Sequence, residues 1–414
     1  MRRIVTILSI ISFSLGAILL SSCSYLVEPQ TLAVVSCALY DYDGEKFIVD
    51  YEIIAPAAAA KDSSLKLGER AGIIIHGDGD CVETAIANAG RQTERLIYSA
   101  SCRARIFTER LARDRKAMSK MFDYLMRQPD FRETAVLFIV NENDIDKVFS
   151  ADTGLTHLTG EYLMGLSDSQ PKSESTAPFT TTLSFINAAL SSGIEPVATY
   201  ISFETKHDSA MEGSESGGNE AENSENAAAH FNLNSIALFK NCEMAGVLYE
   251  NDALLINILR GDEKQHSLDA EDEDMLICFA FSKMKGKIKA SEKDGKLDLK
   301  IVIKGQLNVN DVIFKTDEDV ELSDLNDEII EIAEKRLTEV FTKTIKELKK
   351  YDCDAIGSGN AIASQDYDKW MKIKKDGTHD FQDSNVHFEY DISFARIGEL
   401  TTPFGKMSTE TDTD

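Results

Sequence analysis

The stretch FSKMKGKIKASEKDGKLDLKIVIKGQLNV, from Phe281 to Val309, holds two alternating runs on either side of Asp294-Gly295. An Asp-Gly pair between such runs is typical of the tight turn of a β-hairpin. The second run carries apolar residues at every other position, which places them on one face of a strand. These residues are Leu297, Leu299, Ile301 and Ile303. The stretch therefore predicts a hairpin in the second half of the chain.

A long amphipathic helix and a further strand follow this hairpin. Between Leu325 and Tyr351, apolar residues recur every four positions and form one stripe. The stripe consists of Ile329, Ala333, Leu337, Phe341 and Ile345. The segment begins with acidic residues and ends with lysines, which suits the helix dipole. The last alternating run, NVHFEYDISFARIG, predicts a strand that closes the fold.

The first half of the chain mixes strands and helices. TLAVVSCALYDYDGEKFIVDYEII, which starts at Thr31, predicts another hairpin around Asp43-Gly44. KAMSKMFDYLMRQ predicts an amphipathic helix that ends before Pro129, and a buried strand is expected from Ala135 to Val140. This alternation indicates an α/β or α+β first domain.

Residues Thr205 to Ala229 differ from their surroundings in composition. The sequence TKHDSAMEGSESGGNEAENSENAAA is rich in Gly, Ser, Asn and Glu and poor in large apolar residues. Such a segment buries too little surface to order itself. We therefore expect a flexible linker or a long loop here.

The chain opens with MRRIVTILSIISFSLGAILLSSCS, in which two arginines precede an apolar run of signal-peptide length. Leu20-Ser-Ser-Cys23 fits the bacterial lipobox. In that pathway Cys23 receives a diacylglyceryl thioether, becomes the first residue after cleavage, and is then N-acylated. About two acyl chains suffice for stable anchoring. The alternative is an uncleaved anchor helix with an incidental cysteine.

Composition limits the classes of function. The chain has 414 residues, of which 44 are Lys or Arg and 70 are Asp or Glu, so its formal net charge is −26. Phosphate backbones would be repelled, which argues against nucleic acid as a partner. The same charge argues against a protein body that lies flat on anionic lipid.

The remaining six cysteines form no CxxC pair, so a zinc ribbon or a thioredoxin-like motif is absent from the sequence. They are Cys37, Cys81, Cys102, Cys242, Cys278 and Cys353. Several stand among apolar residues, and we expect the six cysteines to be buried free thiols.

No catalytic or cofactor motif stands out, and we expect no enzymatic activity and no cofactor. The histidines form no HExxH, no HxH and no pair four residues apart. Gly77 to Gly79 belongs to neither a phosphate loop nor a dinucleotide fingerprint, and a turn is expected there. The segment around Gly357 lacks the G-x-S-x-G of a nucleophile elbow. The acidic run Asp269 to Met275 lacks EF-hand spacing, so we expect a solvated loop.

Several short motifs resemble the Ger(x)C family, the lipoprotein C-subunits of spore germinant receptors. Behind the lipid Cys, Glu28 matches the family pattern, although Ser24 and Tyr25 replace its usual Trp-Asp. Glu109 to Ala112 resembles a Glu-x-x-Ala element, and Ser101 stands where a His is frequent. DYLMRQPDFR and IALFKNCEMAGVL resemble two further elements. The matching residues in these are Asp123, Arg127, Pro129 and Arg132, then Ala237, Phe239, Lys240, Met244, Gly246 and Leu248, and further on Asp354, Gly357, Trp370, Phe381, Arg396 and Gly398.

The resemblance implies a lipid-anchored, three-domain α+β protein at the outer face of the cell membrane, which is the inner spore membrane. Integral-membrane A and B subunits of a nutrient receptor would be its partners. We expect a signal peptide at 1–22, an N-terminal α/β domain at 23–204, the linker at 205–229, a middle β-rich domain at 230–310, a C-terminal α+β domain at 311–400 and a disordered tail at 401–414.

Some alternatives remain open at this point. Arg127 and Arg132 either contact a partner or fix the loop after the helix by binding carbonyls or carboxylates. Trp370, the only tryptophan, either fills the core or anchors a docking partner. The competing class of function is a solute-binding lipoprotein of a transporter, which requires two similar lobes, and the halves of this sequence are unlike. A lipid-anchored hydrolase is a weaker third class.

Overall fold

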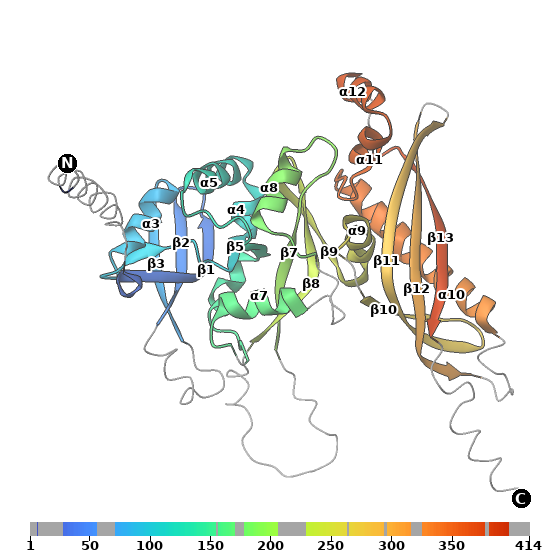
Figure 1. The fold of residues 1–414 in the computed structure, drawn as a ribbon, viewed down its shortest axis with the longest axis horizontal. Coiled ribbons are helices and arrows are strands. Elements are labelled where there is room, and N and C mark those ends of the chain that lie inside the picture. Colours follow the sequence, from blue (N-terminus) through green and yellow to red (C-terminus); the bar gives the residue numbers. More distant parts are fainter. Residues whose placement is uncertain are drawn as a thin grey trace, which may run out of the picture.

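The computed structural model describes residues 28–55, 71–154, 156–169, 178–205, 229–262, 265–293, 296–315, 325–376 and 381–396, together with Thr6. Cys23, residues 206–228 and the tail 401–414 lie outside the described residues. The described chain builds two sheets that lie one after the other along the long axis of the molecule (Figure 1). None of its helices is long and apolar enough to cross a membrane.

The first sheet is mixed, with the strand order β3-β2-β1-β5-β6-β7-β8-β9 and a short β4 that also pairs with β1. Its central strands β1, β5, β6 and β7 are parallel, whereas the strands at both edges are antiparallel. The strands are β1 (Leu32–Tyr42), β2 (Phe47–Ile54), β3 (Gly72–Gly79), β4 (Leu96–Tyr98), β5 (Ala104–Thr108), β6 (Val136–Val140), β7 (Val197–Thr205), β8 (Ala229–Lys240) and β9 (Glu243–Tyr249). The expected hairpin at Asp43-Gly44 and the buried strand ending at Val140 are confirmed.

Helices cover both faces of this sheet. One core contains Ala85, Met118 and Phe185, which come from three different helices, and the opposite core contains Val148 and Leu163. The helices of the first face are α3 (Val82–Gly90), α4 (Glu109–Arg113), α5 (Arg115–Arg127) and α8 (Thr182–Leu190), and those of the second are α6 (Ile145–Val148) and α7 (Thr159–Ser169). Short 3-10 turns occur at Pro29–Thr31 and Glu142–Asp144.

The expectation of a turn at Gly77 to Gly79 is wrong, because these residues belong to β3. Helix α3 passes so close to this strand that a Cβ on Gly77 would lie 2.2 Å from the carbonyl oxygen of Ala85. The glycines are thus needed for the contact between strand and helix.

The second sheet has the order β10-β11-β12-β13. Its elements are β10 (Gln265–Glu271), β11 (Met275–Lys293), β12 (Lys296–Phe314), β13 (Asn385–Arg396) and the covering helix α10 (Asn326–Lys350). The pair Lys293 and Lys296 closes the β11–β12 hairpin, as the sequence predicts. Leu299, Ile301 and Ile303 are fully buried and pack in one core with the stripe of α10. The acidic run from Asp269 is not a free loop: Asp269 to Glu271 end β10, and a tight turn leads into β11.

A compact junction joins the two sheets. It contains a 3-10 turn (Glu250–Ala253), α9 (Leu254–Arg260), α11 (Ser358–Gln365) and α12 (Tyr367–Asp376). Ile236 and Leu238 of the first sheet belong to the same hydrophobic core as α9 and the second sheet. This continuous core explains how the two sheets are held together.

The structure places the limits of the two sheets elsewhere than the expected domain boundaries. Thr205 pairs with Ala229, so residues 206–228 connect two neighbouring strands of one sheet rather than two domains. Strands β8 and β9, which we expected in the middle domain, complete the first sheet. The position 310/311 falls inside β12. Composition distinguishes this segment from its surroundings, but it does not show which strands pair on either side of it.

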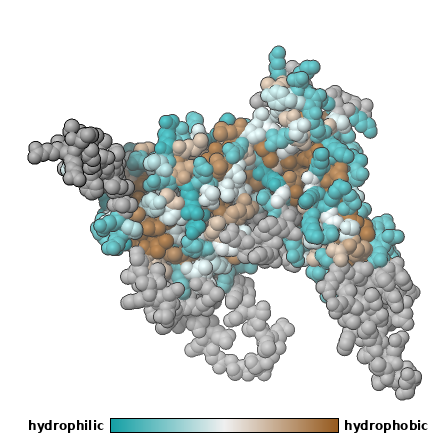
Figure 2. Space-filling view, viewed as in Figure 1, coloured by the Kyte–Doolittle hydropathy of each residue, from teal (hydrophilic) through white to brown (hydrophobic). Residues whose placement is uncertain are grey.

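The visible surface is uneven in hydropathy. The face seen in Figure 2 is mostly hydrophilic, and hydrophobic residues gather there in separate areas.

Candidate functional site

Polar side chains gather where the parallel strands β1, β5 and β6 end. The pairing of Tyr40 with Phe107 and of Thr108 with Val140 brings Asp41, Thr108 and Asn141 to the same edge of the sheet. In sheets with parallel strands, the carboxyl ends of the strands are the usual place for ligands. This edge is therefore the first candidate for a functional site.

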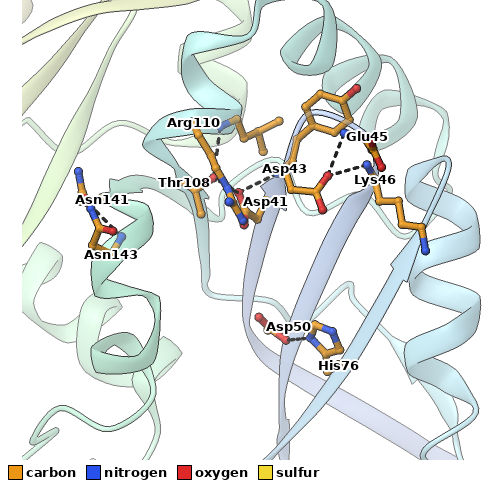
Figure 3. Close-up of polar contacts among 12 residues, drawn as sticks. Asp41, Asp43, Glu45, Lys46, Asp50, His76, Thr108, Arg110, Asn141 and Asn143 are labelled. Atoms are coloured by element: carbon orange, nitrogen blue, oxygen red, sulfur yellow. Dashed lines mark hydrogen bonds and ion pairs between the residues drawn. The ribbon is translucent and has the colours of Figure 1, made fainter.

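Asp41 is held by Thr108, the last residue of β5, and by Arg110 of α4 (Figure 3). Its carboxylate accepts hydrogen bonds from the hydroxyl of Thr108 and from both Nε and Nη2 of Arg110, the Nε bond being 2.7 Å long. Asp41 is only 1% exposed. A bidentate arginine is a strong partner for a buried carboxylate. The negative charge of Asp41 is therefore balanced by the positive charge of Arg110.

Glu109, next to Thr108, is a second centre of hydrogen bonds. Oε2 accepts from the hydroxyl of Tyr200 at 2.8 Å and from the amide of Asn141 at 3.2 Å. Oε1 accepts from Nε of Arg113 at 2.8 Å. These bonds link α4 to β7 and to Asn141, the residue that follows β6. Arg113 also reaches the carbonyl oxygen of Met244 on β9.

The protonation states follow from these contacts. Burial alone raises the pKa of Glu109, but the hydrogen bonds from Tyr200 and Arg113 outweigh it, so this pKa lies below its usual value. Burial, followed by the bond to Glu109, raises the pKa of Tyr200. At neutral pH, Glu109 is therefore a carboxylate and Tyr200 a neutral phenol.

Two further contacts in Figure 3 stabilise the neighbouring strands. Asp43 Oδ1 accepts from the backbone amides of Glu45 and Lys46 and fixes the β1–β2 turn. Across β2 and β3, Nδ1 of His76 lies 2.7 Å from Oδ1 of Asp50. Burial raises the pKa of Asp50, and the contact with His76 partly counteracts this effect.

A shallow, charged hollow of about 590 Å3 opens beside Glu109. It is lined by Glu109, Arg110, Arg113, Asp114, Arg115, Lys116, Glu142 and Glu243. Asp114 caps α5 through bonds to the amides of Lys116 and Ala117. Two of the arginines in this lining are paired with carboxylates, Arg110 with Asp41 and Arg113 with Glu109.

Within the described ranges, no group of three or more His, Cys, Asp or Glu side chains is arranged to hold a metal ion. None of the described cysteines forms a disulfide. Cys37, Cys102 and Cys353 are buried as expected, but Cys81 is exposed, and Cys242 and Cys278 are half-buried. The expectation of burial is thus wrong for Cys81, which stands just before α3 on the surface.

The two arginines around Pro129 fix local structure. Arg127 forms an ion pair with Asp123 one turn earlier at 3.0 Å. Arg132 binds the hydroxyl of Thr134 and, at 3.4 Å, the carbonyl oxygen of Ala100. The contacts of Arg132 agree with the alternative in which it fixes the loop, whereas the exposed pair of Arg127 with Asp123 lies within α5. Trp370 is 6% exposed and packs at the junction, where a Cβ on Gly359 would lie 2.8 Å from its ring.

Several other residues singled out in the sequence meet at this junction. Asp354 accepts from the amides of Gly357, Ser358 and Gly359 and so caps the start of α11. Gly357 has φ +77°, a conformation that favours glycine. Of the residues singled out in the sequence, Glu109 thus lies at the strand edge, whereas Asp354, Gly357 and Trp370 lie at the junction.

Cys23 lies outside the described residues.

Three buried or half-buried polar residues have roles that the sequence did not indicate: Asp41, Arg105 and Arg260. Nη2 of Arg260 donates to the carbonyl oxygens of Glu195 and Ala355 and thereby ties the two sheets together. Arg105 has a usable signature, a lone charge in the apolar strand ARIF. Asp41 and Arg260 have no such signature in the sequence, because their partners are remote along the chain.

Two protein-family models match this chain, one after the other. The first, described as "Spore germination protein N-terminal domain", matches residues 26–203. The second, described as "Spore germination B3/ GerAC like, C-terminal", matches residues 234–398. Among solved structures, the chain is similar to the "Crystal Structure of the GerBC protein", with 16% sequence identity and a TM-score of 0.49 over 87% of this chain and 97% of that one. A search of curated proteins gave no match.

Proposed function

This chain belongs to the Ger(x)C family of spore germination proteins, and we propose on that basis that it is the C-subunit of a nutrient germinant receptor. The observation that carries the proposal is the order of the two family matches, which together extend from residue 26 to residue 398. In this role the protein acts in spore germination by assembling with integral-membrane A and B subunits.

The proposal includes a lipid anchor at Cys23 and a location at the outer face of the inner spore membrane. The lipobox Leu20-Ser-Ser-Cys23 behind an apolar run supports it. Two acyl chains hold a protein stably on a bilayer. Confinement beside membrane partners raises their effective concentration, which favours assembly without a large interface.

We also propose that the protein works without catalytic turnover. The charged groups at the strand edge engage each other, as Asp41 does with Arg110 and Glu109 with Arg113. The continuous core at the junction supports a body that keeps its shape while it holds partners. These features suit an assembly component.

The anchor is tested by Cys23→Ala. We expect the variant to lose metabolic labelling with radioactive palmitate and to remain unprocessed, because the acylated thiol is gone. The matched control is Cys81→Ala, which removes a thiol that is exposed on the folded body and should leave labelling intact. Unchanged labelling of Cys23→Ala would exclude the lipid anchor.

The receptor function is tested in spores. Deletion of the gene should remove the response to particular nutrients and leave germination by non-nutrient triggers intact. A chain without its anchor should complement the deletion poorly, since it is no longer confined beside its partners. Co-purification with A and B subunits from detergent-solubilised spore membranes should succeed with the anchored form.

The alternative is a solute-binding lipoprotein of a transporter. Such a protein would bind its solute alone, and its loss would impair uptake in growing cells. Tight nutrient binding by the isolated protein, together with normal germination of the deletion strain, would favour this alternative over the receptor subunit.

A further inference from the structure

A cavity of about 450 Å3 lies on the helical face of the first sheet, apart from the strand edge described above. It is bounded by β1, β2 and β5 beneath, and by α3, α5 and the segment before β5 around it. Its volume is within the range of about 300–1,000 Å3 that is common for small-molecule sites. Neither the strand-edge network nor the junction uses it.

The base of the cavity holds a buried cation, Arg105 of β5, which is 2% exposed. Its Nη1 donates to the carbonyl oxygen of Arg132 at 2.6 Å and to the hydroxyl of Thr182 at 3.0 Å. The guanidinium also lies over the ring of Phe131, 4.9 Å from the centroid. No carboxylate among the described residues forms an ion pair with it, and its Nε lacks a hydrogen-bond partner there.

This arrangement is costly for the protein alone. A buried charge is normally paired, and a buried donor is normally satisfied. Arg110, the arginine five residues later, shows the ordinary solution, because it binds Asp41 through two nitrogens. Among the described residues Arg105 has neutral partners only, so no carboxylate there compensates its charge, which can pair with an incoming anion.

Two tyrosines stand beside Arg105 in the cavity lining. Tyr40 and Tyr51 are 2% and 1% exposed, and their hydroxyl oxygens are 3.1 Å apart. Burial raises the pKa of both phenols, that of Tyr40 to about 12, so both are neutral at physiological pH. The bond between them uses one of their two protons, which leaves one hydroxyl donor for a further acceptor.

The rest of the lining defines the body of the ligand. Ile86, Tyr124, Leu125 and Phe131 give apolar and aromatic walls. Carboxylates also line the cavity, at Glu83 and Asp130, and both residues are exposed. Arg95 lines the cavity as well, so the three outer charged residues sum to one net negative charge, which repels a second negative charge on a ligand.

We propose that this cavity binds a small organic monocarboxylate, whose carboxylate pairs with Arg105 and whose apolar body lies between the aromatic walls. The guanidinium is the side chain best matched to a carboxylate. The proposal concerns binding by this chain alone, so it stands or falls independently of assembly into a receptor.

The test is equilibrium dialysis of the full chain in detergent with radiolabelled benzoate, with benzamide as a neutral analogue of the same shape and detergent alone as the blank. Benzoate should bind saturably, and benzamide should bind at least about tenfold more weakly, because it lacks the charge that pairs with Arg105.

Two variants locate the site. Arg105→Gln removes the charge and should weaken benzoate binding by about tenfold or more. Ala87→Trp leaves Arg105 in place but fills the cavity from an exposed position on α3, and it should abolish binding. Ser119→Trp is the matched control, since Ser119 is an exposed residue of α5 outside the cavity, and it should bind as the unaltered chain does.

If Arg105→Gln fails to fold, Ala87→Trp decides the question. The proposal is overturned if benzoate shows no saturable binding up to about 10 mM, or if Ala87→Trp binds benzoate as tightly as Ser119→Trp. In that case Arg105 serves only to fix the loop at Arg132 and the start of α8.

Discussion

Gly246 on β9 lies directly against the ring of Tyr351, the residue that follows α10, so that a Cβ at Gly246 would be 2.4 Å from the ring atoms Cε1 and Cζ. This contact joins the edge of the first sheet to the helix that covers the second sheet. Nearby, Sγ of Cys353 lies 3.1 Å from the carbonyl oxygen of Phe239. The orientation of the two sheets therefore depends on a close backbone approach that only glycine permits.

Gly246→Ala should destabilise the protein by about 1–3 kcal/mol, because the added methyl group overpacks the junction. Urea unfolding at constant pH measures this change. Gly165→Ala is the control, since Gly165 lies in α7 and nothing is within 4 Å of its added Cβ; it should be neutral or stabilise by less than about 1 kcal/mol. Equal midpoints for the two variants would contradict the close contact.

Glu109→Gln should lower stability at neutral pH by about 1 kcal/mol, because the charge paired with Arg113 is lost while the shape of the side chain is kept. The folded pKa of Glu109 is below the ordinary value of 4.5. Its stabilisation is therefore complete above about pH 4.5 and is lost as pH falls through the lower, folded pKa. The difference between the variant and the unaltered chain should shrink over this acidic range.

The control for Glu109 is Glu45→Gln, at the exposed β1–β2 turn, which should change the free energy of unfolding by less than about 0.5 kcal/mol at any pH. Urea titrations at neutral and acidic pH compare the two variants. A difference for Glu109→Gln that stays constant across the acidic range would show that its carboxylate is not stabilised in the folded state.

Cys81 should be the first of the described cysteines to react with iodoacetamide in the native protein. It is exposed, and a hydrogen bond with Thr84 lowers its pKa. Burial raises the pKa of Cys102 and Cys353, so these thiols should react only after unfolding. Mass mapping of alkylated peptides gives the order, and early labelling of Cys353 would mean that the junction opens.

Residues Thr205 to Ala229 should contain the first site of limited proteolysis, on the basis of their composition. Because Thr205 pairs with Ala229 and the strands β7 and β8 stay hydrogen-bonded, the two fragments should remain associated after the cut. Size-exclusion chromatography of the nicked protein checks this. Fragments that separate without denaturant would restore the segment as a linker between independent domains.

Local periodicity determined the elements of this protein. The alternation around Leu299 predicted a strand, and the stripe from Ile329 predicted a helix; the structure contains both. The spacing of apolar residues along the sequence reveals the element because it reflects which face is buried. The order of short motifs likewise indicated the family. Part of the strand edge was visible in the same way, since Glu109 belongs to one of these motifs.

The tertiary structure alone decided which elements meet. The sequence does not show that β12 lies parallel to β13, nor that β7 pairs with β8 across residues 206–228, because a buried face does not identify its partner. For the same reason Asp41 and Arg110, 69 residues apart, could not be matched beforehand. The cavity at Arg105 is formed by strands and helices that are distant in sequence. The sequence shows the charged residue, but it does not show which elements surround it.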